Sequence, residues 1–342
     1  MGGFVSTFST VGFGNAFGIF QEYYETHQLL HKSNFDIVWI GAIQSFVLFA
    51  CAPLAGIMAD RIGPFIPLSI GSIGLLLGVF MTSLCSTYYQ FFLAQGLLIG
   101  MGMSFLTIPC IAVVSRLFLR NRGLAMGFVI AGSSIGGVVW PIEMNNLLNR
   151  DGIGFGWTLR VVGFTMIPLC GFVVVTLGLI SKQAGNNSST KSAQHSKADF
   201  SIMKNPAFIF LCIGLAICFL GFFTPFFFCS SYGVTIGLST SFSFYLPAIA
   251  CAGSFFGRTI PGYLADRYGS FNILVLASLL SGIVAFCWTA ADTIGGVAVW
   301  TLAYGFASGS LISLQATCAT KISTPQTHGT AVGLVMGGGA LT

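Results

Sequence analysis

Long apolar runs separated by short polar loops set the strongest limit on what this chain can fold into. Each run is about 20 residues long, the length of α-helix that crosses a hydrocarbon core about 30 Å thick. Only 7% of the residues are charged, whereas an ordinary soluble domain is about a quarter charged. The sequence therefore predicts an all-α membrane protein embedded in the lipid bilayer. The predicted helices lie near residues 1–20, 37–59, 67–86, 90–114, 122–147, 158–181, 206–229, 241–264, 271–290 and 294–318, with a further run from His328 to Thr342.

The basic residues indicate how these helices are oriented, because cytoplasmic loops carry an excess of Lys and Arg. With the N-terminus placed inside, ten of the 14 Lys and Arg residues fall in cytoplasmic segments, three in outer segments, and Arg258 within an apolar run. We therefore expect a multi-pass protein with a cytoplasmic N-terminus, in the plasma membrane or alternatively the vacuolar membrane. The net charge of +5 is spread along this topology and forms no patch, so no nucleic-acid partner is expected.

An internal repeat predicts how the helices are grouped. GIMADRIG at 56–63 and GYLADRYG at 262–269 agree at five of eight positions, with an offset of 206 residues. The same offset places Gly123 on Gly329. Two copies of a six-helix unit in parallel orientation are therefore expected. The predicted division is an N-terminal six-helix bundle at 1–181, a polar cytoplasmic linker at 182–205 and a C-terminal bundle at 206–342.

The second copy of the repeat is expected to be incomplete. It contains four full apolar runs and part of a fifth, where the first copy contains six. The run from His328 to Thr342 would form about 22 Å of helix, which is too short to span a bilayer. The expected architecture is two parallel six-helix bundles, truncated here to about 11 helices with the last one incomplete.

The repeated Ala-Asp-Arg turns predict a gate. Asp60 and Arg61 end the second predicted helix, and Asp266 and Arg267 end the eighth. A carboxylate at such a place can cap the N-terminus of a facing helix and interact with its dipole. Contacts of that kind form in one arrangement of two bundles and break in the other. The alternative is that these charges only anchor the helix ends at the membrane surface.

Several longer stretches resemble one known family. The GxxADRxG turn resembles the loop signature of the major facilitator superfamily. NAFGIFQEYYE at 15–25, RGLAMGFVIAGSSIGGVVWP at 122–141, GFGWTLR at 154–160 and GRTIPGYLADRYGSFNIL at 257–274 resemble the fungal branch of its monocarboxylate porter family. The resemblance covers the whole chain. It implies two bundles that rock about a central site and carry a small organic solute, with monocarboxylates and riboflavin among the family's substrates.

The resemblance also gives Arg258 a role. A mid-membrane Arg costs at least about 2.5–3.5 kcal/mol, so it requires a polar partner. In the family, the matching arginine is held to pair with the substrate carboxylate, which suits a guanidinium. Animal relatives have a proton-coupling Asp one turn earlier, where this chain has Ser254, which is a further candidate for binding the solute. The alternatives for Arg258 are snorkelling to the surface or a bond to another helix.

Further polar residues in the apolar runs are candidates for the solute site. Asn15 could donate amide hydrogen bonds to a solute, or bond to a neighbouring helix. Tyr304 and Ser308 lie one turn apart and could line the cavity, although ordinary packing is the alternative. Glu143, near the outer end of its helix, is a candidate for coupling to a proton, with an interfacial location as the alternative.

The function that best fits these features is secondary active transport by alternating access. The solute is expected to be an anion such as a monocarboxylate or riboflavin, and a proton is a candidate co-substrate. The alternative is a transporter-like nutrient sensor that binds its solute without moving it. An enzyme is not expected, since the nine acidic residues are scattered. The sequence contains no ATP-binding GxxxxGK[ST] loop, and no metal or other cofactor site is expected.

Overall fold

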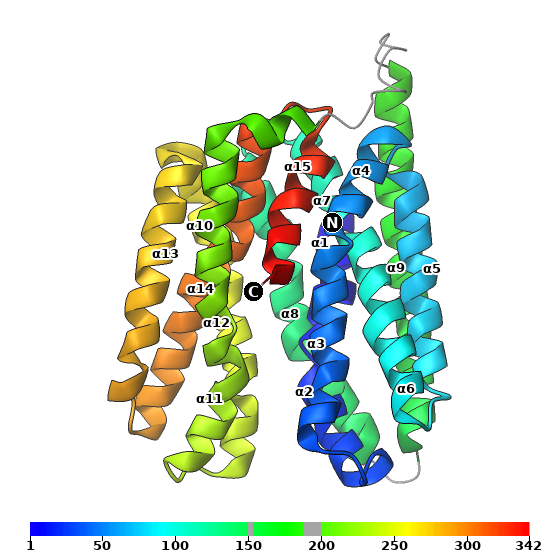
Figure 1. Cartoon of the computed structure of the whole chain (residues 1–342), viewed down its shortest axis with the longest axis vertical. Helices are drawn as coiled ribbons and strands as arrows, with labels where there is room; N and C mark the ends of the chain where they lie inside the picture. The colour runs from blue at the N-terminus through cyan, green and yellow to red at the C-terminus, as the bar shows by residue number, and fades with distance from the viewer. Residues whose placement is uncertain (150–152, 188–199, 342) are drawn as a thin grey trace.

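The fold is a set of long helices that run nearly parallel to one another (Figure 1). The computed structural model describes residues 1–149, 153–187 and 200–341, and these contain no strand. Eight helical stretches within the described residues are long and apolar enough to cross a membrane. The prediction of an all-α membrane protein is confirmed.

The first group of helices precedes residue 188 and the second follows residue 199. The first group comprises α1 (Gly2–Thr7), α2 (Phe17–Tyr23), α3 (Asn34–Ala50), α4 (Ala52–Arg61), α5 (Phe65–Thr82), α6 (Tyr88–Phe91), α7 (Gly100–Leu117), α8 (Arg122–Asn149) and α9 (Gly154–Asn187). The second group comprises α10 (Pro206–Phe222), α11 (Thr224–Thr235), α12 (Thr240–Tyr268), α13 (Ser270–Phe286), α14 (Ile294–Ile322) and α15 (His328–Gly338).

Several predicted membrane runs consist of two or more helices joined by a local distortion. The run predicted at 37–59 is α3 followed by α4, which carries a proline near its N-terminus, and the run at 206–229 is α10 followed by α11 with the same feature. Proline has no N–H for the helix ladder, so a helix bends or restarts there. The first run is interrupted at Asn15, between a π-helical segment and α2.

The predicted linker at 182–205 is only partly visible. Helix α9 continues to Asn187, so its first residues are helical, and a 3-10 segment at Phe200–Lys204 precedes α10. Residues 188–199 of the linker lie outside the described residues. One end of the molecule holds the ends of α4 and α9, the 3-10 segment and the start of α15 (Figure 1, top). We call it the linker end.

The two groups pack closely against each other near the linker end. In Figure 1, α15 lies beside α4 and α7 of the first group, and α8 lies beside α12. Glycines permit the approach: Gly56 of α4 faces the backbone of Gly329, and Gly123 of α8 faces the backbone of Gly262. A Cβ at any of these four positions would overlap the facing chain. Small residues at helix contacts let backbones meet in this way.

Candidate gate and solute site

Asp60, the penultimate residue of α4, is bonded to three residues on two other helices at the linker end. Its carboxylate accepts hydrogen bonds from the backbone N–H groups of Gly329 (3.0 Å) and Thr330 (2.6 Å), in the first turn of α15. The Thr330 hydroxyl donates a further bond of 2.7 Å, and Arg116 of α7 forms an ion pair with the same carboxylate. Asp60 therefore caps a helix of the other group while it holds a cation of its own group.

Asp266, near the end of α12, makes the reciprocal contact. Its two carboxylate oxygens accept hydrogen bonds from the backbone N–H groups of Gly123 (2.8 Å) and Leu124 (2.9 Å), in the first turn of α8. Free N–H groups and the positive end of the helix dipole make such a terminus a favourable place for a carboxylate. Each group of helices thus supplies one carboxylate that caps a helix of the other.

The 206-residue offset relates the two caps to each other. Adding 206 to Asp60 gives Asp266, and adding 206 to Gly123 and Leu124 gives Gly329 and Thr330. The glycine contacts obey the same rule, because Gly56 plus 206 is Gly262. The linker end is consequently a pseudo-twofold contact in which equivalent residues exchange partners, as expected where two copies of one unit meet.

A third matched pair extends the contact deeper into the molecule. Gly127 of α8 faces the carbonyl group of Arg258, and Gly333 of α15 faces the carbonyl group of Ala52. Gly333 lies 206 residues after Gly127, and Arg258 lies 206 residues after Ala52. The two groups therefore touch along about two helical turns from the linker end inward.

The arginines of the two Ala-Asp-Arg turns are not part of these contacts. Arg61 is exposed, and the exposed Arg267 lies over the ring of Tyr263 on its own helix at 4.7 Å. The cation that joins these contacts is Arg116, which was expected only as a topological charge. Arg122 is a second missed residue, and its guanidinium donates to the carbonyl oxygen of Thr320 across the two groups (2.9 Å). Their position at helix ends beside the turns was the available signal.

Arg258 is buried, and the structure places it at the contact between the groups. Its guanidinium donates to the carbonyl oxygen of Ile130 (2.8 Å) and to the hydroxyl of Ser133, both on α8. Its Nε has no hydrogen-bond partner in the structure. Of the alternatives considered for this residue, a bond to another helix is therefore present, while part of the guanidinium stays unsatisfied.

Asn15 lies at the interruption of the first helical stretch, close to helices of both groups. It is exposed, and its side chain contacts Gly137 of α8, which also contacts Cys251 of α12. Cys251 is two turns before Arg258 on the same helix. Asn15 and Arg258 thus border the same seam between α8 and α12, Arg258 nearer the linker end.

The other candidates for the solute site make contacts inside one group. Tyr304 donates to the carbonyl oxygen of Phe222 (2.7 Å), at the break between α10 and α11, and Ser308 donates to the carbonyl of Tyr304 on its own helix (2.6 Å). Ser254 is buried against Gly309 of α14. Glu143 is half-buried near the far end of α8. Of the hydrogen bonds among the described residues, none joins these four residues to Arg258 or Asn15.

Comparison with known proteins decides the family. A family model described as the Major Facilitator Superfamily matches residues 1–342. The chain belongs to the major facilitator superfamily. The Agnestins efflux protein AgnL12 of Paecilomyces divaricatus is 44% identical over 98% of this chain and 76% of its own length. The Aspyridones efflux protein apdF of Emericella nidulans is 39% identical over 96% of this chain and 66% of its own length.

A solved structure supports the same fold. The proton:xylose symporter XylE superposes with a TM-score of 0.76 over 99% of this chain and 85% of that chain, at 14% sequence identity. This chain is therefore a multi-pass member of a superfamily of transporters, and the predicted major facilitator fold is confirmed. The pseudo-twofold contact at the linker end is the meeting of the two halves of that fold.

Proposed function

We propose that this major facilitator protein is a secondary transporter that exports a small organic anion by alternating access. The observation that carries the proposal is the set of three matched contacts at the linker end, each formed between the two halves. Hydrogen bonds to helix N-termini and glycine contacts can break without unfolding either half, because each half keeps its own helix ladders. The arrangement is that of a gate closed at one end.

The two halves are proposed to move as units, with residues 1–181 as one bundle, 206–342 as the other and 182–205 as the connection. In the closed arrangement, Asp60 and Asp266 act as latches, supported by Arg116 and Arg122. Arg61 and Arg267 are proposed to act only at the surface of the gate, since they do not bridge the halves. Opening the linker end would expose the seam that contains Arg258.

The proposed solute is an organic acid with an apolar body. Arg258 offers a guanidinium with an unsatisfied Nε, which suits a carboxylate or an acidic enol. Asn15 offers amide hydrogen bonds further along the same seam, near Cys251, which is two helical turns before Arg258. Two relatives are named as efflux proteins of agnestins and of aspyridones, which favours export of a secondary metabolite over uptake of a monocarboxylate or riboflavin. Tyr304, Ser308 and Ser254 are proposed to shape the wall of the cavity, and Glu143 to couple a proton.

Transport assays with sealed vesicles test this proposal. Inside-out membrane vesicles that contain the full-length protein should accumulate an agnestin or an aspyridone when a proton gradient is imposed, and should accumulate lactate and riboflavin much less. Vesicles from cells without the protein are the control. Uptake of lactate or riboflavin at the higher rate would instead support the monocarboxylate porter interpretation. Equal uptake with and without the protein would contradict transport altogether.

The orientation of the chain is part of the proposal. The excess of Lys and Arg at the linker end predicts that this end, the N-terminus and the linker face the cytoplasm. A cysteine introduced at Ser192 should therefore resist an impermeant thiol reagent in intact cells and react after the cells are opened. The exposed Cys287, at the opposite end, provides the matched outer position. Labelling of the Ser192 position in intact cells would show that the linker faces outward and would contradict this orientation.

A further inference from the structure

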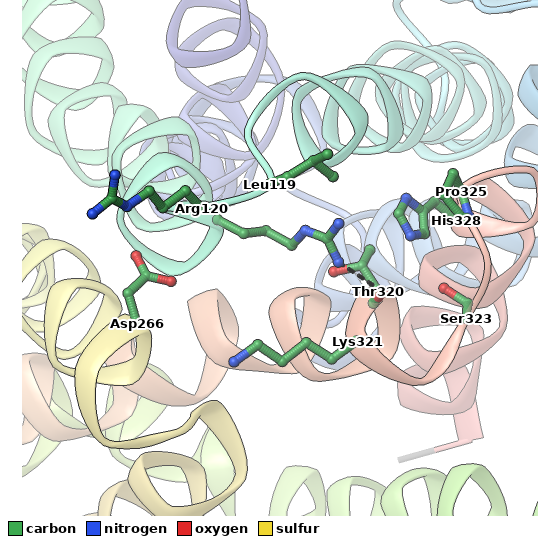
Figure 2. Close-up of a pocket in the computed structure, with 9 residues that line it drawn as sticks. Leu119, Arg120, Asp266, Thr320, Lys321, Ser323, Pro325 and His328 are labelled. Carbon is green, nitrogen blue, oxygen red and sulfur yellow. Dashed lines mark hydrogen bonds between the residues drawn. The ribbon is translucent and has the colours of Figure 1, made fainter.

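A cavity of about 290 Å³ opens at the linker end beside the second latch. Figure 2 shows Asp266 at one side of it, Thr320 and Lys321 on α14, and Ser323 and His328 at the other side. The cavity is shared between the halves. Its lining residues are Leu119, Arg120 and Arg122 from the first half and Asp266, Thr320, Lys321, Ser323, Pro325 and His328 from the second.

The charge around this cavity is strongly positive and unbalanced. Arg120, Arg122 and Lys321 contribute three cations, and within the described part of the chain none of them has a carboxylate at ion-pair distance. The one carboxylate in the lining, Asp266, already accepts two backbone hydrogen bonds. The N-termini of α8 and α15 also lie at the cavity, where Asp266 and Asp60 cap them.

Polar atoms in the lining remain without partners. The Nε of Arg122 and the hydroxyl of Ser323 are buried and have no hydrogen-bond partner in the structure. Buried donors of this kind are costly unless a water or a ligand satisfies them. His328 is almost fully buried next to the cavity, and its Nδ1 lies 3.3 Å from the hydroxyl of Ser115.

The equivalent position of the first latch has no such excess of free cations. There, Arg116 is paired with Asp60. Residue 322, which lies 206 positions after Arg116, is an isoleucine, so Asp266 has no cation equivalent to Arg116. Arg120, Arg122 and Lys321 line the cavity beside Asp266 instead. Two otherwise matched contacts therefore differ in their charge.

We propose that this cavity binds a phosphate group, which bridges Arg120 and Arg122 of one half and Lys321 and Ser323 of the other. Arginine forks and lysine are common partners of phosphate oxygens. A ligand that touches both halves binds only while the linker end is closed, so it stabilises that arrangement. The group can come from the headgroup of an anionic phospholipid in the adjacent leaflet or from a soluble phosphate compound. The binding does not depend on which solute is transported.

Thermal unfolding of the full chain in nanodiscs tests the proposal. In phosphatidylcholine discs, inorganic pyrophosphate should raise the unfolding midpoint if a soluble compound is the ligand. If the ligand is a lipid headgroup, discs that contain phosphatidylinositol 4-phosphate should raise the midpoint relative to phosphatidylcholine discs, with no effect of pyrophosphate. Failure of both additions to change the midpoint would overturn the site.

Matched variants identify the cavity as the place of binding. Arg120→Gln and Lys321→Gln change exposed cations on opposite halves. Each should lower the affinity for the probe that raises the unfolding midpoint about tenfold, as expected for loss of one charge-assisted bond. Lys204→Gln removes an exposed cation at the same end but outside the cavity, and should leave the affinity unchanged. An equal loss in Lys204→Gln would indicate general charge attraction and overturn the site. A loss in only one of the two lining variants would overturn the bridge between the halves.

Discussion

Replacing Arg258 with Gln should reduce transport of the anionic solute by more than about tenfold. The substitution removes the permanent charge at the seam between α8 and α12 while it keeps a shorter polar side chain. Hydrogen bonds to a charged group contribute about 1.5–3 kcal/mol each, and about 1.4 kcal/mol corresponds to a factor of ten. The measurement is the initial rate of uptake into inside-out vesicles that contain equal amounts of inserted protein.

Two comparisons separate solute binding from a structural bond. Ser133→Ala removes one of the partners that Arg258 holds in the closed arrangement, so it should mimic Arg258→Gln if the arginine only ties the halves together. If the guanidinium binds the carboxylate, the transport rate of a methyl ester of the solute should be the same with and without Arg258. Arg258→Lys retains the charge but loses the fork, and should mainly raise KM. An Arg258→Gln protein that transports acid and ester with equally reduced rates would contradict the binding role.

The behaviour of Arg258 shows where sequence reasoning reached its limit. An arginine inside an apolar run must have polar partners, and the sequence indicated this much. The chain itself supplies two of them, a carbonyl group and a hydroxyl on α8, which lies more than a hundred residues away. No local pattern gives the side of a helix that faces its neighbour when both sides are apolar. The partner therefore emerged only from the packing of the two halves.

The repeat allowed a more specific prediction than was drawn from it. An offset of 206 residues relates Asp60 to Asp266 and Gly123 to Gly329. In a pseudo-twofold contact between such repeats, equivalent residues exchange partners. The helix caps follow directly from that rule. What the repeat could not provide is the departure from symmetry, because Arg116 pairs with Asp60 while its equivalent, Ile322, has no charge. Assigning the arginine of each Ala-Asp-Arg turn to the gate overlooked a cation on a neighbouring helix.

That asymmetry predicts unequal latches. Asp60→Asn should shift the balance between the closed and open linker end toward the open state by about 1–3 kcal/mol, a factor of about 5–150. The amide can accept only part of the bonds made by the carboxylate, and it leaves Arg116 without its ion-pair partner. Asp266→Asn should shift the balance less, by about 1 kcal/mol, because Asp266 holds two N–H groups and no paired cation.

The distance between spin labels at Ile62 and Gln326, two exposed positions on either side of the first latch, measures this balance. Labels are introduced after the reactive natural cysteines have been replaced. Asp36→Asn provides the matched control: Asp36 belongs to a capping box at the start of its own helix, α3, at the opposite end, so it should leave the distances unchanged. The wild-type distribution should be dominated by the short distance, with a longer one gaining population in Asp60→Asn. If Asp60→Asn and Asp266→Asn shift the distribution equally, the ion pair with Arg116 contributes nothing to the gate, and the charge of the capping carboxylate alone holds it closed.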